Sequence, residues 1–192
     1  MDARLRDITA EGVEQEIIFP QKFFTLLFLE NLEEKEWVAR AYNQALAEFC
    51  AQGEGRLHGV AILNWWDPAQ TKDALAEIKA LGFKTVMVPI QPGKFTDGTP
   101  IAYHDKRMDP FWDAVQDAGL PLNFHIGERP VSPSNTSRGA AGIFVMGQMG
   151  GMRNVWSTLT FGGVFERNPG VQVIFVESGL HWVPGALQEA DM

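Results

Sequence analysis

Short apolar runs alternate with longer helical stretches along this chain, and this alternation constrains the fold more than any other feature. Five runs predict β-strands: EIIFP (16–20), RLHGVAILN (56–64), KTVMVPI (84–90), PLNFHI (121–126) and VQVIFVE (171–177). Strands that are apolar almost throughout are typical of a parallel sheet covered on both faces. The sequence therefore predicts an α/β fold.

The stretches between these runs carry helical signals. Helices are expected over 33–52, 67–82, 109–121 and 181–192, and a loosely amphipathic helix over 142–170, after an exposed loop rich in Ser, Pro and Gly over 128–142. In the second helix Asp67 is expected to cap the first turn, which Pro68 fits, and Gln70 to complete a capping box.

Five strands leave the architecture open. A (β/α)8 barrel needs eight strands and typically about 250 residues, whereas this chain has 192. The pattern of strands and helices fits either a smaller open sheet or a part of a barrel.

Composition limits the classes of partner and the compartment. A net charge of −8 provides no basic stripe for phosphates, so we expect no nucleic-acid and no membrane partner. The lone Cys50 excludes an intrachain disulfide and is compatible with a reducing cytosol. The N-terminal segment is too charged for a signal peptide, and no apolar run reaches transmembrane length. We therefore expect a cytoplasmic protein.

Four histidines limit any metal or acid–base site. His125 ends the fourth apolar run, and Glu177 ends the fifth. Ligand and catalytic groups collect at the carboxyl ends of parallel strands, so both residues lie on the expected functional rim. His104 and His181 follow strands and could approach this rim, whereas His58 begins a strand and is expected to be structural.

Each of the two leading candidates has an ordinary structural alternative. His125 could be a half-buried histidine that is hydrogen-bonded to a backbone carbonyl. Glu177 could cap a loop or pair with Arg129 or Arg153. A divalent-metal site usually needs three or more protein ligands, and the sequence offers two strong candidates.

Three segments together resemble the amidohydrolase-related family. They are RLHGVAILNWWDPAQTKDALAEIKALGFKTVMVP (56–89), MDPFWDAVQDAGLPLNFHIGE (108–128) and FGGVFERNPGVQVIFVESGLHWVP (161–184). The family contains metal-dependent hydrolases and decarboxylases, such as the aminocarboxymuconate semialdehyde decarboxylase and related aromatic-acid decarboxylases. The resemblance implies a distorted (β/α)8 barrel with a divalent ion at its carboxyl-end mouth.

The resemblance also implies roles for individual residues. His125 matches the metal ligand after the family's fifth strand, and Glu177 falls at the sixth-strand position, where many members carry a histidine. The expected metal ligands are His125 and Glu177, the expected catalytic residues Glu177 and His104, and the expected substrate-binding residues Trp65, Trp66, Arg129 and His181. Zinc is the first expectation for the ion, with manganese or iron as alternatives.

The same resemblance aligns EIIFP with the family's second strand and places Met192 in the helix after strand six. We therefore expect a partial (β/α)8 TIM barrel covering strand 2 to helix 6, as one domain over 1–192 truncated at both ends. Open strand edges predict association, here a homo-oligomer.

The expected function is a metal-dependent hydrolase or decarboxylase acting on a small, aromatic or carboxylate-bearing substrate. The first alternative is a non-catalytic truncated barrel that serves as a binding or assembly module. The second is a complete small enzyme with its own site around His104, His125 and Glu177.

Overall fold

The computed structural model describes residues 2–20, 26, 29–127 and 138–192, and its strands lie within the five predicted apolar runs. The strands are β1 (Glu16–Ile18), β2 (Leu57–Gly59), β3 (Ala61–Ile62), β4 (Val86–Met87), β5 (Leu122–His125) and β6 (Val173–Val176). The second run is divided into β2 and β3 at Val60. Every pairing between these strands is parallel, as predicted.

The helices follow the predicted stretches closely. They are α1 (Asp2–Ala10), α2 (Leu32–Ala51), α3 (Thr71–Ala80), α4 (Asp109–Ala118), α5 (Ala140–Phe161), α6 (Val164–Arg167) and α7 (Val183–Ala190), with short 3-10 turns at Pro68–Gln70 and Lys106–Met108. Only α1, in the charged N-terminal segment, had no counterpart among the expected helices. Within the described part of the chain, no helix is long and apolar enough to cross a membrane.

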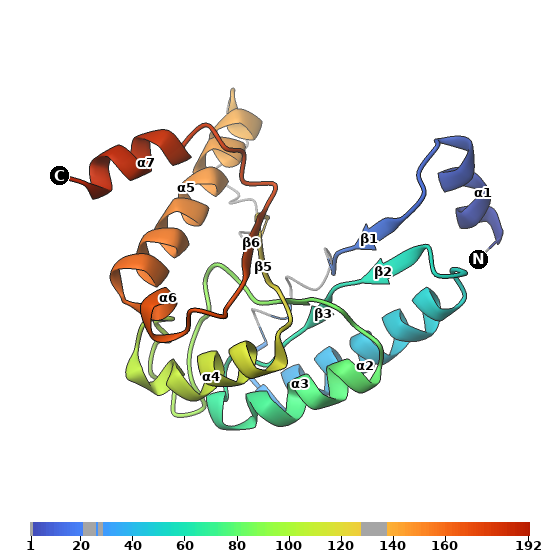
Figure 1. The fold of residues 1–192 in the computed structure, drawn as a ribbon, viewed down its shortest axis with the longest axis horizontal. Helices are drawn as coiled ribbons and strands as arrows, with labels where there is room; N and C mark the ends of the chain where they lie inside the picture. Colours follow the sequence, from blue (N-terminus) through green and yellow to red (C-terminus); the bar gives the residue numbers. More distant parts are fainter. Residues whose placement is uncertain (1, 21–25, 27–28, 128–137) are drawn as a thin grey trace.

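The strands are wound in one direction. Their order is β1-β2 in one sheet and β3-β4-β5-β6 in the other, so neighbours in space are neighbours in sequence. A doubly wound sheet would reverse this order at a switch point, whereas a (β/α)8 barrel does not. Figure 1 shows the strands as a curved layer, with α2, α3 and α4 along its convex side and with β1 and β6 at its two ends.

Coverage of the sheet on both faces is expected, and among the described residues the centre of the sheet fits it, because all four residues of β5 are buried. Leu122 and Phe124 of β5 face the helices and are fully buried. In the edge strands, Ile17 of β1 is 59% exposed and Ile174 of β6 is 45% exposed. β1 is an edge strand of the first sheet and β6 of the second, so each has a neighbouring strand on one side and is less covered than the strands between them.

The main core lies between the strands and the helices. Its largest fully buried side chains include Phe111 and Trp112 of α4, which pack near Phe124 of β5 through the Tyr103 ring. The indole Nε1 of Trp112 donates to the Tyr103 carbonyl over 2.6 Å, so its polar group is satisfied inside the core. This packing fixes the position of β5 and of the histidine at its end.

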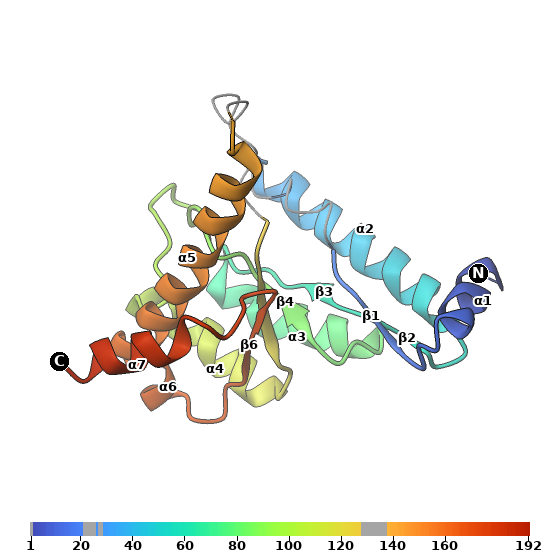
Figure 2. The ribbon, with the colours of Figure 1, turned by 90° about the horizontal axis from the view of Figure 1, so that it is seen from above.

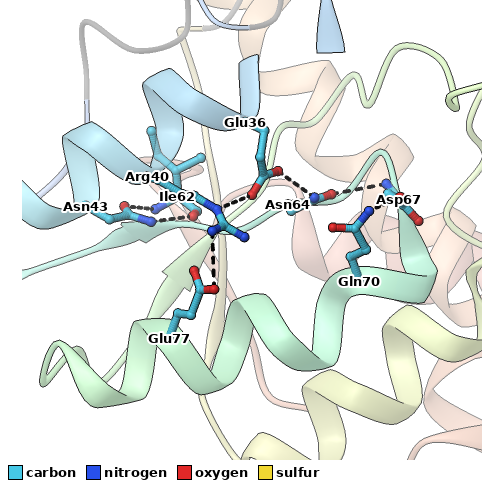
Figure 3. A network of polar contacts seen from close by, with 8 residues as sticks. All are labelled: Glu36, Arg40, Asn43, Ile62, Asn64, Asp67, Gln70 and Glu77. Atoms are coloured by element: carbon cyan, nitrogen blue, oxygen red, sulfur yellow. Dashed lines mark hydrogen bonds and ion pairs between the residues drawn. The ribbon is translucent and has the colours of Figure 1, made fainter. Parts of the chain in front are cut away.

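The side chain of Asn43 on α2 completes the backbone pairing of β3. Its amide nitrogen donates to the Ile62 carbonyl over 2.9 Å, and its oxygen accepts from the Ile62 amide over 2.8 Å (Figure 3). Asn43 is 5% exposed, so both bonds are shielded from water. Among the described residues, β1 ends at Ile18 and no strand pairs with β3 on this side, so Asn43 takes that place.

The start of the third helical segment differs from the prediction. Asp67 makes no side-chain capping bond to the helix. Its backbone amide instead donates to Asn64 Oδ1 over 3.1 Å, and Gln70 Nε2 donates to Asp67 Oδ2 over 2.8 Å. The predicted capping box is therefore wrong. In such a box the Gln70 side chain would accept from the Asp67 backbone amide, but this amide already donates to Asn64.

A chain of polar contacts extends from this turn to the helices. Asn64 donates to Glu36 over 2.7 Å, and Arg40 lies between Glu36 at 2.8 Å and Glu77 at 3.3 Å (Figure 3). The network bridges α2 and α3 across a groove between them. It therefore holds the turn after β3 against the first half of α2.

We predict that Asn43→Ala lowers the free energy of unfolding by about 1–3 kcal/mol, because it leaves the buried amide and carbonyl of Ile62 without partners. The matched control is Gln44→Ala on the same helix, whose exposed side chain contacts only Glu48 and whose loss is expected to cost about 0.5 kcal/mol or less. Urea unfolding measures both values. Equal losses for the two variants would contradict the role given to Asn43.

Candidate functional site

The ends of β5 and β6 bring the two leading candidates together. In the register of this pair, His125 lies opposite Val176, and Glu177 is the next residue. Side chains alternate along a strand, and Phe124 faces the helices, so His125 faces the concave side of the sheet. The expected placement of the ring at the rim, away from the helices, agrees with this arrangement.

The His125 ring is buried and held in one orientation. It is 2% exposed, and its centroid lies 5.1 Å from that of the Phe19 ring, which follows β1. Its Nδ1 lies 2.6 Å from the Ile126 carbonyl oxygen. A carbonyl only accepts, so Nδ1 carries the proton, and in the neutral ring Nε2 presents a lone pair. The bond to a backbone carbonyl, expected as the structural alternative, is thus also what a metal-ligating histidine needs.

Glu177 faces this lone pair from a constrained backbone position. Its Oε2 lies 3.8 Å from His125 Nε2, and its side chain is 58% exposed. Its φ of 57° places a non-glycine residue in the left-handed region, which persists only where neighbouring structure imposes it.

The residues after Glu177 impose that conformation. The Ser178 hydroxyl lies 3.2 Å from the Phe175 carbonyl and 3.0 Å from the Gly179 carbonyl. The Ser178 carbonyl accepts from Trp182 Nε1 over 3.1 Å, and the Trp182 ring packs against Phe175 of β6. The turn is therefore pinned on both sides, and the Glu177 carboxylate is directed at His125.

The two facing atoms fit a shared cation. A lone pair of a neutral imidazole and a carboxylate oxygen repel each other unless a proton or a cation lies between them. Their separation of 3.8 Å is less than two metal–ligand bonds of about 2.0–2.2 Å each placed end to end, so one ion can contact both atoms. Among the described residues, however, no group of three or more His, Cys, Asp or Glu side chains could hold a metal.

The other predicted site histidines are not gathered around this pair. His104 is exposed and lines a separate cavity of about 420 Å³ between the loop after β4 and α5, with Asn154 and Thr158 on the opposite wall. His181 is exposed and lies against Gly179 in the turn after β6. Their assigned roles stay predictions.

The predicted substrate-binding tryptophans are buried under the rim. Trp65 and Trp66 are each 3% exposed and meet edge to face, with ring centroids 4.7 Å apart. Trp65 Nε1 donates to the Pro92 carbonyl over 2.6 Å. Arg129 lies outside the described residues. Pairing of Glu177 with Arg153 is wrong, because Arg153 pairs with Glu189 of α7 instead.

The structure also shows a buried charge at this rim that the sequence prediction missed. Lys35, in the first turn of α2, is 7% exposed, and its Nζ lies 5.7 Å from the Trp65 ring centroid and 5.3 Å from that of Trp66. Burial lowers the pKa of Lys35 below its ordinary value. One signal was available: Lys35 shares the helical spacing of Leu32, Ala39 and Leu46, which form the inner face of α2.

Comparison with known proteins shows the family to which the chain belongs. The family model described as amidohydrolase matches residues 1–191. The chain belongs to this family. Among curated amidohydrolase relatives, gamma-resorcylate decarboxylase of Rhodococcus jostii is 29% identical over 172 residues, which cover 80% of this chain and 48% of that protein. The chain thus spans about half the length of the curated relatives it matches.

Solved structures of similar fold agree with the winding of the strands. An amidohydrolase from Mycobacterium avium subsp. paratuberculosis superposes with a TM-score of 0.79 at 21% identity, over 99% of this chain and 50% of that one. A 2,6-dihydroxybenzoate decarboxylase from Rhizobium gives 0.69 at 24% identity, over 94% and 57%. A 5-carboxyvanillate decarboxylase from Novosphingobium aromaticivorans with bound manganese gives 0.76 at 20% identity, over 98% and 54%. The predicted partial (β/α)8 barrel of an amidohydrolase is confirmed.

The positive φ of Glu177 leads to a prediction about stability that does not depend on a ligand. We expect Glu177→Gly to raise the free energy of unfolding by about 1 kcal/mol relative to Glu177→Ala, because glycine adopts a positive φ without the steric cost of a Cβ. Both variants remove the carboxylate, so their difference in thermal or urea unfolding isolates the backbone. An alanine variant as stable as the glycine variant would show that the turn is not strained.

Proposed function

We propose that this chain contributes the His125–Glu177 half of a divalent-metal centre in an enzyme that decarboxylates a small aromatic acid. The observation that carries the proposal is the convergence of His125 Nε2 and Glu177 Oε2 at 3.8 Å, on the rim where parallel strands end. Family membership supports the metal. The curated relatives are decarboxylases of an aromatic acid, which supports decarboxylation over hydrolysis.

A bound divalent ion would supply a Lewis acid that polarises a carboxylate or carbonyl oxygen of the substrate and lowers the pKa of bound water. His125 would be a neutral ligand through Nε2, with its ring fixed by the Ile126 carbonyl and the Phe19 ring. Glu177 would be the second ligand. Its exposed carboxylate also suits transfer of a proton, because solvent reaches it at the rim.

The identity of the ion belongs to the same proposal. Zinc was the first expectation, with manganese or iron as alternatives, and a solved 5-carboxyvanillate decarboxylase of similar fold contains manganese. One imidazole nitrogen and one carboxylate oxygen suit any of the three ions. We therefore include both zinc and manganese in the test.

Association with further copies is also proposed. Large apolar side chains are exposed on several elements: Trp37, Ile143, Met146, Phe161, Leu180 and Leu187. Exposed apolar surface of this kind is typical of protein–protein contacts. It supports the homo-oligomer expected from the open strand edges.

A second candidate function is a non-catalytic binding or assembly module. The observation that favours it is the lack, among the described residues, of a third ligand near His125 and Glu177. The reading as a complete enzyme around His104, His125 and Glu177 has less support, because His104 lines a different cavity.

We predict that, in equilibrium dialysis against Zn²⁺ or Mn²⁺, the purified chain retains up to about one ion per chain, as measured by mass spectrometry of the metal. Binding is measured in the presence of free ion because two protein ligands hold a divalent ion weakly. His125→Ala should abolish retention. Glu177→Gln should weaken the affinity about 10-fold or more, because a neutral amide replaces the carboxylate. Release of CO2 from 2,6-dihydroxybenzoate by the loaded chain tests the reaction itself.

The matched control is Glu54→Gln. Glu54 is also an exposed glutamate with a positive φ, of 53°, but it precedes β2 at the opposite end of the strands. This variant should bind metal like the wild type. A folded chain that retains no ion would favour the binding module, and retention that survives His125→Ala would exclude the site.

A further inference from the structure

Lys35 carries a buried charge that the proposed metal chemistry does not use. Its side chain is 7% exposed, yet among the described residues no hydrogen bond or ion pair reaches its ammonium group. Burying a charge without a partner is costly. A lysine in this position therefore either lowers the stability of the fold or pairs with a negatively charged ligand.

The described groups around the Lys35 ammonium attract its charge but do not accept hydrogen bonds from its N–H donors. The rings of Trp65 and Trp66 lie beneath Nζ at 5.7 and 5.3 Å, which is cation–π distance. An ammonium group has three N–H donors, and ring faces are poor substitutes for an oxygen acceptor. The tryptophans thus hold the charge in place and leave its donors available to a ligand.

A cavity of about 540 Å³ opens beside Lys35. Its walls come from the loop after β4, with Lys94, Phe95 and Thr96, and from the entry to α2, with Leu29 and Leu32. The volume is in the range of small-molecule sites. Among the described residues of its lining, Lys35 and Lys94 carry positive charge and Glu30 carries negative charge, so this lining is net positive in a chain of net charge −8.

We propose that this cavity binds the carboxylate of a small aromatic acid, with the Lys35 ammonium as its counter-ion. The carboxylate would accept charge-assisted hydrogen bonds from Nζ, while Leu29, Leu32 and Phe95 provide apolar walls for a ring. Inorganic phosphate would pair with the ammonium group but would gain nothing from the apolar walls. The site is at the carboxyl-end rim, since its residues follow β1, β3 and β4, but it contains neither His125 nor Glu177.

The test uses the full chain after removal of metal with EDTA, and benzoate as the probe. Benzoate should change tryptophan fluorescence, because Trp65 and Trp66 lie under the ammonium group, and calorimetry should give the affinity. Lys35→Met should weaken binding about 10-fold or more. Lys72→Met, at an exposed lysine of α3, should leave it unchanged.

Further measurements test whether the carboxylate is needed for binding, and whether binding at the Lys35 cavity is independent of the metal centre. Neutral benzamide should not bind, and phosphate should not displace benzoate. His125→Ala should still bind benzoate, so the failure of the metal centre and the failure of this site remain distinguishable. Lys94→Met, at an exposed lysine of the cavity wall, should weaken binding and serves if Lys35→Met does not fold.

Stability gives an independent readout. Because Lys35 is charged and unpaired, Lys35→Met should raise the melting temperature at neutral pH. Burial lowers the pKa of Lys35, so the folded chain loses this proton before the unfolded chain does, and the advantage of methionine should shrink as the pH rises toward 10.5. Unchanged benzoate binding in Lys35→Met, equal binding of benzamide, or a lowered melting temperature of this variant would overturn the proposal.

Discussion

The parallel pairing of β5 with β6 is the constraint on which the candidate site depends. Both strands end at the same edge, and their register places His125 beside Val176. The left-handed turn at Glu177 then redirects the chain, so that its carboxylate faces the imidazole instead of continuing along the strand. A shift of one residue in this register would move His125 to the helix side, because side chains alternate between the faces of a sheet.

Helices on the convex side of the sheet hold the strands of this edge in place. Helix α4 packs Phe111 and Trp112 near the far side of β5, and the Asn43 amide completes the pairing of β3 where β1 has ended. Seen from above, α2 and α5 rise on either side of the strands (Figure 2). The curved, singly wound layer that results is concave toward the rim, and it brings the His125 pair and the Lys35 cavity to the same end of the strands.

Much of this arrangement could be predicted from the sequence, because apolar periodicity reports burial directly. The strands and α2, α3 and α4 follow from it, and the position of His125 at a strand end follows from the strand itself. Features that depend on remote partners could not be predicted. The Asp67 amide donates to Asn64 and not to Gln70, and the cation–π contacts of Lys35 depend on tryptophans from another loop. The exposure of Ile17 and Ile174 follows from the position of β1 and β6 at the sheet edges, which the apolar pattern does not encode.

In the proposed metal centre, the Ile126 carbonyl holds the proton on Nδ1 of His125, and Nε2 faces the metal. Long-range ¹⁵N–¹H NMR of the imidazole rings tests it most directly, because it distinguishes the two tautomers of each histidine. We expect neutral His125 to be protonated at Nδ1, and Zn²⁺ to shift its Nε2 resonance but not that of exposed His104. A proton on Nε2, or an Nε2 resonance that zinc leaves in place, would show that His125 does not bind the metal through this atom.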